Sequence, residues 1–233
     1  MTELSFIDFK CPHCGDMASF LEEFAGTAQS CPTCSDTVIV PKDGAAVGRA
    51  VPLPLTTPRL VLRRFTPTDW KDLLEVMSDE EMFHHVDGLP LEEEQILRWL
   101  DSDTHVKLTT PNQPFHLGLE ERTGRKLIGY AALRILEQAS QQANVSVFVN
   151  RKFQRQGFAT EALKAMLLFC FDAIGLHRVT AHCESRDAAA CRLLEKAGMQ
   201  REGEFRQDRL RDGEWVNTVW FGALSEDLSK AKP

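Results

Sequence analysis

Four cysteines near the beginning of the chain constrain its first module more tightly than any other feature. They are spaced C-x2-C-x16-C-x2-C, at positions Cys11, Cys14, Cys31 and Cys34. Each Cys-x-x-Cys pair directs two thiolates towards one ion, and two pairs complete the tetrahedral shell that Zn²⁺ prefers. A thioredoxin-like redox pair is the competing interpretation, but it requires a β-α-β unit, for which residues 1–44 are too short. The spacing therefore predicts a structural zinc site in a small ribbon of two hairpins.

The size and charge of this module indicate what it does. About 44 residues cannot bury enough apolar surface to fold alone, so the metal is expected to hold the module together. Residues 1–44 contain seven acidic and two basic side chains, and so carry five of the seven net negative charges of the 233-residue chain. Neither the module nor the nearly balanced remainder has the basic surplus needed for nucleic-acid binding. We expect no nucleic-acid partner, and a structural or protein-docking role for the ribbon.

A segment rich in Gly, Ala and Pro follows the ribbon. The stretch "GAAVGRAVPLPLTTP", residues 44–58, has little hydrophobic periodicity, which is typical of a linker. From Arg59 onwards the pattern changes to longer strand and helix units. The sequence therefore predicts three parts: a zinc ribbon at 1–43, a linker at 44–56 and an α/β domain at 57–228.

Hydrophobic periodicity predicts the elements of the α/β domain. Strands are expected at 59–65, 115–120, 127–136, 143–149, 178–183 and in a final hairpin turning at Asp212-Gly213. Helices are expected at 66–77, 91–101, 158–173 and 188–197. The first helix has a capping pattern at Thr66, and the last is capped by Asp187. The order β-α-α-β-β-β-α-β-α-β-β indicates a mixed sheet flanked by helices.

The stretch "QRQGFA", residues 154–159, joins the strand at 143–149 to the helix that begins at Phe158. The first turn of a helix has backbone N–H groups without partners and a partial positive charge, so it can bind phosphate. Gly157 lets the backbone approach an anion where a Cβ would block it, and Ala159 keeps the helix entrance open. An ordinary strand–helix turn is the alternative interpretation. The Walker and dinucleotide-binding patterns do not occur here.

The longer stretch "VNRKFQRQGFATEAL" resembles the acetyl-CoA signature Q/R-x-x-G-x-G/A of the GNAT acetyltransferases. The resemblance extends to "TPRLVLRRFTPTDW" at the domain start, "LIGYAAL" at 127–133 and "CRLLEKAGM" at 191–199, and covers about 57–225. Within the superfamily the chain is similar to the branch of ribosomal-protein N-terminal acetyltransferases, which also includes acetylators of polyamines. The resemblance implies a GNAT fold whose central sheet is splayed between the strands at 143–149 and 178–183, and acetyl-CoA as co-substrate.

The resemblance also implies which residues meet acetyl-CoA. The pantetheine arm would enter the gap and pair with backbone groups around Val147 and Val149, and the diphosphate would rest on the amides of 155–160. A backbone N–H near Phe148 would polarise the thioester carbonyl, an effect of about 3–4 kcal/mol when well placed. Asp187 stands where the family often has an Asn that contacts the cofactor arm. The implied cofactor-binding residues are Val147, Phe148, Val149, Gln154, Arg155, Gln156, Gly157, Phe158, Ala159, Thr160 and Asp187.

Two departures from the family affect acid and base catalysis. A Tyr that protonates the leaving thiolate is frequent where Leu194 stands, and the only tyrosine of the chain, Tyr130, is far from it in sequence. The branch often has Glu where Asn144 stands. His182 and Glu184 share a side-chain parity at the mouth of the gap and are the favoured bases; a packed histidine and a solvated glutamate are the alternatives. The predicted catalytic residues are His182, Glu184 and Phe148.

A weak base also bears on the acceptor, because an amine must be neutral to attack. At pH 7, deprotonation costs about 1.4 kcal/mol for an α-amine but about 4.6 kcal/mol for a lysine. The sequence therefore favours transfer of acetyl to a primary amine, most of all a protein N-terminal α-amine, by direct attack in a ternary complex. The alternatives are a polyamine-type acetyltransferase and a non-catalytic acyl-CoA-binding regulatory or scaffold protein.

Other polar residues give weaker signals. His84 and His85 fall where the acceptor site of this family usually begins, although surface histidines are the simpler interpretation. The acidic stretches at 79–81 and 92–94 could attract a cationic acceptor or be solvated helix faces. Cys170, Cys183 and Cys191 are expected to pack in the core.

The expected compartment follows from the cysteine count and the N-terminus. Seven cysteines, an odd number, fit a reducing environment. The first residues, "MTELSFIDFK", do not resemble a signal peptide, and the longest apolar stretch is too short to cross a bilayer. We expect a cytoplasmic protein without membrane contact.

Overall fold

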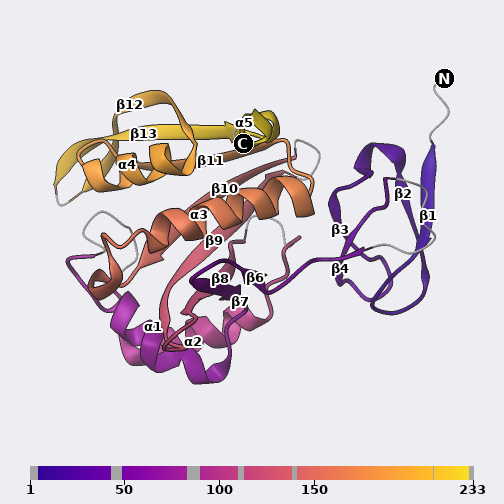
Figure 1. The fold of residues 1–233 in the computed structure, drawn as a ribbon, viewed down its shortest axis with the longest axis horizontal. Helices are drawn as coiled ribbons and strands as arrows, with labels where there is room; N and C mark the ends of the chain where they lie inside the picture. Colours follow the sequence, from indigo (N-terminus) through magenta and orange to yellow (C-terminus); the bar gives the residue numbers. More distant parts are fainter. Residues whose placement is uncertain are drawn as a thin grey trace.

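The computed structural model describes residues 5–42, 49–82, 90–109, 113–137, 141–211 and 213–230. Within these residues, eight strands form one mixed sheet in the order β12-β13-β11-β10-β9-β8-β7-β6 (Figure 1). The strands are β6 (Leu55–Thr56), β7 (Leu60–Arg63), β8 (Phe115–Glu121), β9 (Leu127–Glu137), β10 (Gln142–Val149), β11 (Arg178–Glu184), β12 (Gln200–Arg211) and β13 (Glu214–Leu224). The mixed α/β fold predicted from the sequence is confirmed.

Helices cover both faces of this sheet. They are α1 (Trp70–Met77), α2 (Glu93–Thr104), α3 (Phe158–Leu168), α4 (Ala188–Ala197) and α5 (Ser225–Lys230). α3 and α4 pack on one face, where Leu163 and Leu194 join a large buried cluster with Val145. α1 and α2 pack on the other, where Leu73 and Ile96 form a second cluster with the inner strands. Figure 1 shows α3 lying along the sheet above β9 and β10, with α1 and α2 below.

The sheet divides between β10 and β11. This parallel pair is joined at only three positions, the last of which is Asn144 with Thr180. Beyond them β10 pairs with β9 as far as Val149, while β11 pairs with β13 as far as Glu184. The Asn144 side chain donates a hydrogen bond to the Thr180 carbonyl at 3.2 Å. Asn144, which stands where the resemblance implies a glutamate, therefore joins the two strands at the point where they separate.

The first module forms two small sheets, shown in indigo in Figure 1. Their strands are β1 (Phe6–Lys10), β2 (Met17–Leu21), β3 (Ala28–Ser30), β4 (Thr37–Ile39) and β5 (Arg49–Ala50). β5 pairs with β4, and β6 pairs with β7. Two parts of the segment predicted as a linker, 44–56, are therefore held in strands. The boundaries between the modules stay a prediction.

The first module rests on the end of a helical segment of the main domain. α3 continues into a π-helical turn, η4 (Phe169–Ala173), and the amide of Ala28 donates to the Ile174 carbonyl that follows it, at 3.0 Å. Lys107 Nζ donates to the Ser35 carbonyl at 2.9 Å. Ala28 and Ile39 are buried in the same apolar cluster as the domain core. The two modules therefore share packed surface.

We expect the substitution Gly175→Ala to loosen this contact. Gly175 has φ +80°, and a Cβ on it would lie 2.2 Å from the Gly26 carbonyl oxygen of the first module. The free energy of unfolding should fall by more than about 2 kcal/mol, because the left-handed conformation and the clash both disfavour a side chain. Chemical denaturation measures this change. Gly213→Ala is the control, since Gly213 has φ +82° and nothing within 4 Å. Equal losses in the two variants would contradict a role for the contact.

Candidate functional site

The loop that leads into α3 has an unusual backbone. Arg155 and Gly157 have positive φ values of +60° and +85°, and left-handed residues of this kind turn successive N–H groups into anion-binding concavities. The first hydrogen bond of α3 runs from the Glu161 amide to the Gly157 carbonyl, at 3.0 Å. The amides before it therefore have no partner inside the helix. This geometry suits the phosphate-binding role predicted for 154–160.

Side chains outside the loop fix its shape. Gln154 Nε2 donates to the Val149 carbonyl at 3.0 Å. Arg59 Nη1 donates to the Gln156 carbonyl at 2.8 Å, while Arg59 Nε pairs with Glu161 at 2.7 Å. These contacts join the loop to β10 and to the first turn of α3, and so fix its backbone conformation.

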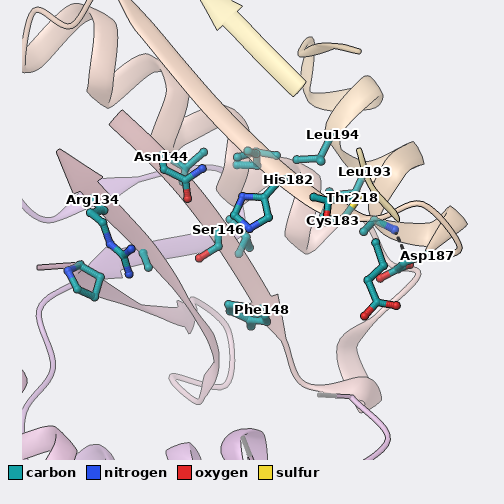
Figure 2. Close-up of a pocket in the computed structure, with 18 of the residues that line it drawn as sticks. Arg134, Asn144, Ser146, Phe148, His182, Cys183, Asp187, Leu193, Leu194 and Thr218 are labelled. Carbon is teal, nitrogen blue, oxygen red and sulfur yellow. Dashed lines mark hydrogen bonds between the residues drawn. The ribbon is translucent and has the colours of Figure 1, made fainter. Parts of the chain in front are cut away.

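A cleft of about 620 Å³ occupies the gap between β10 and β11, within the range of small-molecule sites. Its lining includes Leu194 and Asp187 from the α4 side, and Ser146, His182 and Arg134 from the opposite face of the sheet. In Figure 2, His182 and Ser146 lie between Arg134 on one side and Asp187 on the other. The cleft therefore reaches both faces of the sheet through the place where its strands separate.

The α4 side of the cleft carries Asp187 and Leu194, two of the three positions at which the sequence differs from the expected family pattern. Asp187 caps α4, since its Oδ1 accepts hydrogen bonds from the amides of Ala189 at 3.1 Å and Ala190 at 2.9 Å. Asp187 also lines the cleft. Its role as the helix cap therefore does not remove it from the side where the cofactor is predicted to bind. Leu194 is 7% exposed and offers no proton donor. This side of the cleft is mostly apolar, as suits a pantetheine arm.

His182, one of the two predicted bases, lines the cleft in a restricted state. Its Nε2 accepts a hydrogen bond from Arg209 Nη2 at 2.9 Å, and its ring stacks on Trp220 with centroids 4.7 Å apart. The other ring nitrogen, Nδ1, is buried without a partner among the described residues. Burial and the charge of Arg209 lower the pKa of His182. The imidazole is therefore neutral at pH 7, with its basic nitrogen already occupied. Its catalytic role stays a prediction.

Glu184, the other predicted base, also lines the cleft but is paired on both oxygens. Oε1 accepts from Arg211 Nε and Oε2 from Arg186 Nε, each at 2.9 Å. Its side chain is 3% exposed. Each carboxylate oxygen of Glu184 is therefore bound by one guanidinium group. This role likewise stays a prediction.

Three of the six acidic residues in the stretches singled out in the sequence form ion pairs with other described residues. Asp79 forms an ion pair with Arg151 at 2.9 Å, and Glu81 pairs with the same guanidinium. Glu94 lies 3.6 Å from Arg98, one turn along α2. His84 and His85 lie outside the described residues. The structure therefore offers these acidic groups partners of its own in place of a cationic acceptor.

The family model for the acetyltransferase (GNAT) domain matches residues 59–200. That range holds the loop before α3, the separated strands and α4. The chain belongs to the GNAT acetyltransferase family. It is accordingly an acetyl-CoA-dependent N-acetyltransferase, as the sequence predicted.

Relatives of this GNAT acetyltransferase are distant. The Bacillus subtilis (strain 168) protein named uncharacterized N-acetyltransferase YnaD is 26% identical over 174 residues, which are 74% of this chain and 98% of that protein. The [ribosomal protein uS5]-alanine N-acetyltransferase of Escherichia coli (strain K12) is 24% identical over 119 residues, 51% of this chain and 61% of the enzyme. The crystal structure of a GNAT-family acetyltransferase from Bacillus anthracis superposes with a TM-score of 0.67 at 24% identity, covering 74% of this chain and 98% of that one.

This GNAT acetyltransferase brings its only tyrosine into the cleft. Tyr130 is 4% exposed, lines the cleft and lies with its ring 5.0 Å from that of Phe148. Burial raises the pKa of Tyr130, so the phenol stays protonated. Its neighbour Gly129 lets β9 approach β10 closely, since a Cβ there would lie 2.1 Å from the Phe148 carbonyl oxygen. Neither residue could be assigned to the site from the sequence, because it is the pairing of β9 with β10 that brings them there.

The four cysteines of the first module converge. Their Sγ atoms all lie within 4.8 Å of one another, with Cys11 and Cys34 at 3.8 Å and Cys14 and Cys31 at 3.9 Å. A tetrahedron with Zn–S distances of about 2.3 Å has edges of about 3.8 Å. The cluster therefore fits a Zn²⁺ ion with four thiolate ligands.

Two equivalent backbone turns build this cluster. The amide of Gly15 donates to the Cys11 carbonyl at 3.0 Å, and the amide of Ser35 donates to the Cys31 carbonyl at 2.8 Å. Gly15 and Ser35 both have positive φ, at +80° and +59°. Each Cys-x-x-Cys pair therefore closes a tight turn that points two thiols the same way.

The other cysteines lie in the main domain. Cys170 is completely buried, and burial raises its pKa. Cys183 and Cys191 are half-buried, with Sγ atoms 3.5 Å apart. Among the described residues, no helix is long and apolar enough to cross a membrane.

Proposed function

We propose that this GNAT acetyltransferase transfers the acetyl group of acetyl-CoA to the α-amine of a protein or peptide N-terminus, by direct attack in a ternary complex. The proposal depends most on the charges of the cleft face opposite α3 and α4, where the acceptor would enter. Arg134 and Arg209 both line that face. Glu184, the carboxylate that lines this face among the described residues, is paired with two other arginines.

These charges disfavour a polyamine acceptor. Arg134 is exposed and has no ion-pair partner among the described residues, and its charge is close enough to influence His182. A polycation would meet guanidinium groups at the cleft mouth, and the carboxylate that lines this face among the described residues, Glu184, is already paired. A peptide N-terminus carries one amine, is uncharged when it attacks, and can be followed by acidic side chains. The name of the Escherichia coli relative, which acts on ribosomal protein uS5, supports the same acceptor class.

On the cofactor side, the amides of 155–160 would bind the diphosphate at the entrance of α3. The pantetheine arm would run beside Val147 and Val149, along the edge of β10 that β11 leaves unpaired. The N–H of Phe148 or Val149 would stabilise the negative charge that develops on the thioester oxygen. Asp187 would border the arm on the α4 side. The open strand edge and the helix amides without a partner inside α3 support these assignments.

The test is release of CoA thiol from acetyl-CoA with a matched panel of acceptors. We expect peptides with a free N-terminus to be acetylated at the α-amine, with kcat/KM at least about 10-fold above that of spermidine at pH 7, because the α-amine is more readily deprotonated. The control is the same peptide with a blocked N-terminus and one internal lysine. Mass spectrometry locates the acetyl group. A preference for spermidine would contradict the acceptor, and acetyl-CoA binding without turnover on any amine would favour the scaffold alternative.

We also propose that Cys11, Cys14, Cys31 and Cys34 bind one structural Zn²⁺. The four thiols form a closed shell with no place for a substrate or water, as in structural rather than catalytic zinc sites. The metal would stabilise the first module and its contact with Ile174. Docking of a protein partner on the ribbon stays a prediction.

A further inference from the structure

A buried histidine–aspartate pair lies beside the acceptor face of the cleft. His116 on β8 donates from Nδ1 to Oδ1 of Asp103 on α2, at 2.5 Å. Both residues are buried, with 8% and 3% exposure. His116 nevertheless lines the cleft. A buried histidine hydrogen-bonded to a carboxylate at the wall of a substrate cleft is a frequent arrangement for a catalytic base and the group that orients it.

The surroundings hold the imidazole in one orientation. The His116 ring contacts the Trp99 ring edge-on at 4.9 Å and the Tyr130 ring at 5.9 Å. Arg64 donates to the His116 carbonyl at 3.0 Å and approaches the free oxygen of Asp103 at 3.6 Å. Among the described residues, the charged and titratable groups in contact with the pair are Arg64 and Tyr130, and those elsewhere in the cleft lining are Arg134, His182, Cys183, Glu184, Asp187 and Arg209. Aromatic contacts and the carboxylate leave the ring little freedom to rotate.

The second ring nitrogen is the one available for chemistry. Because Nδ1 donates its proton to Asp103, Nε2 carries the lone pair of the neutral imidazole. In the part of the chain that the structure describes, Nε2 of His116 has no hydrogen-bond partner. This distinguishes His116 from His182, whose Nε2 accepts from Arg209.

The sheet register places this nitrogen on the side where the amine would arrive. His116 pairs with Ala132, and Ala132 pairs with Ser146 on β10, so the three side chains share one face. Two strand spacings separate His116 from β10, about 10 Å between backbones. The imidazole stands on this face, and an acceptor that enters above β10 would be within its reach directly or through one water molecule.

We propose that His116 is the general base of acetyl transfer and that Asp103 is its positioning residue. The proposal rests on the amine acetyltransferase function proposed above. The amine nitrogen attacks the thioester carbon, the C–N bond forms, the C–S bond breaks, and the electron pair leaves on the CoA sulfur. The proton lost by the amine passes to His116 Nε2, and then to the thiolate or to solvent. Asp103 keeps the Nδ1 proton in place and stabilises the imidazolium.

The first experiment is His116→Gln, measured as the pH profile of kcat/KM with a peptide acceptor. Positioned bases contribute about 10²–10⁴-fold, so we expect kcat to fall about 100-fold at pH 7 with acetyl-CoA affinity unchanged. The part of the pH profile that reflects ionisation of the histidine (the histidine limb) should disappear. The remaining pH dependence should reflect only ionisation of the amine. His177→Gln is the matched control, because His177 is exposed and outside the cleft. A variant that keeps the wild-type kcat and profile would overturn the proposal, as would a change confined to KM.

Two further measurements separate the base from a structural role. Asp103→Asn should lower kcat about 10-fold and move the histidine limb to lower pH, because the imidazolium loses its neighbouring negative charge; an unmoved limb would overturn the positioning role. His116→Ala with added imidazole should recover activity, and no recovery in a folded variant would count against a base.

Any hydrolysis of acetyl-CoA by the enzyme, in which water replaces the amine, would give a measurement that needs no acceptor. We expect His116→Gln to reduce hydrolysis by a similar factor. If the wild type acetylates no amine but hydrolysis depends on His116, the proposed acceptor is wrong and the base stands. If amines are acetylated and neither reaction depends on His116, the base is wrong and the acceptor stands.

Discussion

Replacing Gly157 with valine should weaken acetyl-CoA binding at least about 100-fold. Gly157 has φ +85°, and a Cβ on it would already lie 3.3 Å from Arg59 Nη2. A β-branched residue is a strong outlier at positive φ, so the loop must leave its conformation. The amides of 155–160 would then no longer converge on one anion. Titration calorimetry with acetyl-CoA measures the loss.

A matched control separates this effect from general destabilisation. Gly213→Val introduces the same side chain at φ +82°, in a hairpin where nothing lies within 4 Å. It should lower the melting temperature by a comparable amount and leave the Kd for acetyl-CoA unchanged. If Gly157→Val bound acetyl-CoA as tightly as the wild type, the loop would not be the phosphate site, and the cofactor-binding residues predicted from it would have to be replaced.

Local signals explain why much of the fold could be predicted from the sequence. The helix predicted at 188–197 is observed with the same bounds, because Asp187 caps its first amides and Gly198 ends it at φ +99°. The alternating residues at 143–149 likewise form β10. Each of these signals acts within a few residues of the element it defines, so one stretch of sequence is sufficient to identify it.

The site was harder to predict because its decisive contacts are distant in sequence. The pair of Asp103 and His116 joins a helix to a strand 13 residues away, without a motif. Glu184 is predicted as a base from its position on the strand, whereas its partner Arg211 lies 27 residues further along the chain. Such pairings depend on strand register and on side-chain direction. The sequence can place a suitable residue type at a suitable position, but it does not show which other side chain pairs with that residue in the fold.

Removal of the metal should unfold the first module. We expect about one zinc per chain in the purified protein, and none in Cys31→Ser. The apolar cluster of this module contains few residues, namely Phe9, Cys11, Ala18, Cys31, Val38 and Val40. A core of that size stabilises too little, whereas a structural zinc supplies about 10–16 kcal/mol of apparent binding free energy in small peptides. Metal analysis and amide hydrogen exchange of residues 5–42 measure both effects. Cys191→Ser, on α4, is the control and should retain zinc.

Loss of zinc should destabilise the main domain only where the first module contacts it, at the far end of the helical segment that begins with α3. Ala28 and Ile39 belong to the domain core, so exposing them should lower the melting temperature by about 2–4 °C per kcal/mol lost. The acetyl-CoA loop lies at the other end of the helical segment: Phe158 and Ile174 are 16 residues apart, about 24 Å at 1.5 Å per residue. Affinity for acetyl-CoA should therefore survive chelation, measured below the lowered melting temperature. Simultaneous loss of zinc and acetyl-CoA affinity would contradict this separation, because it would mean that the ribbon and the cofactor loop unfold as one cooperative unit.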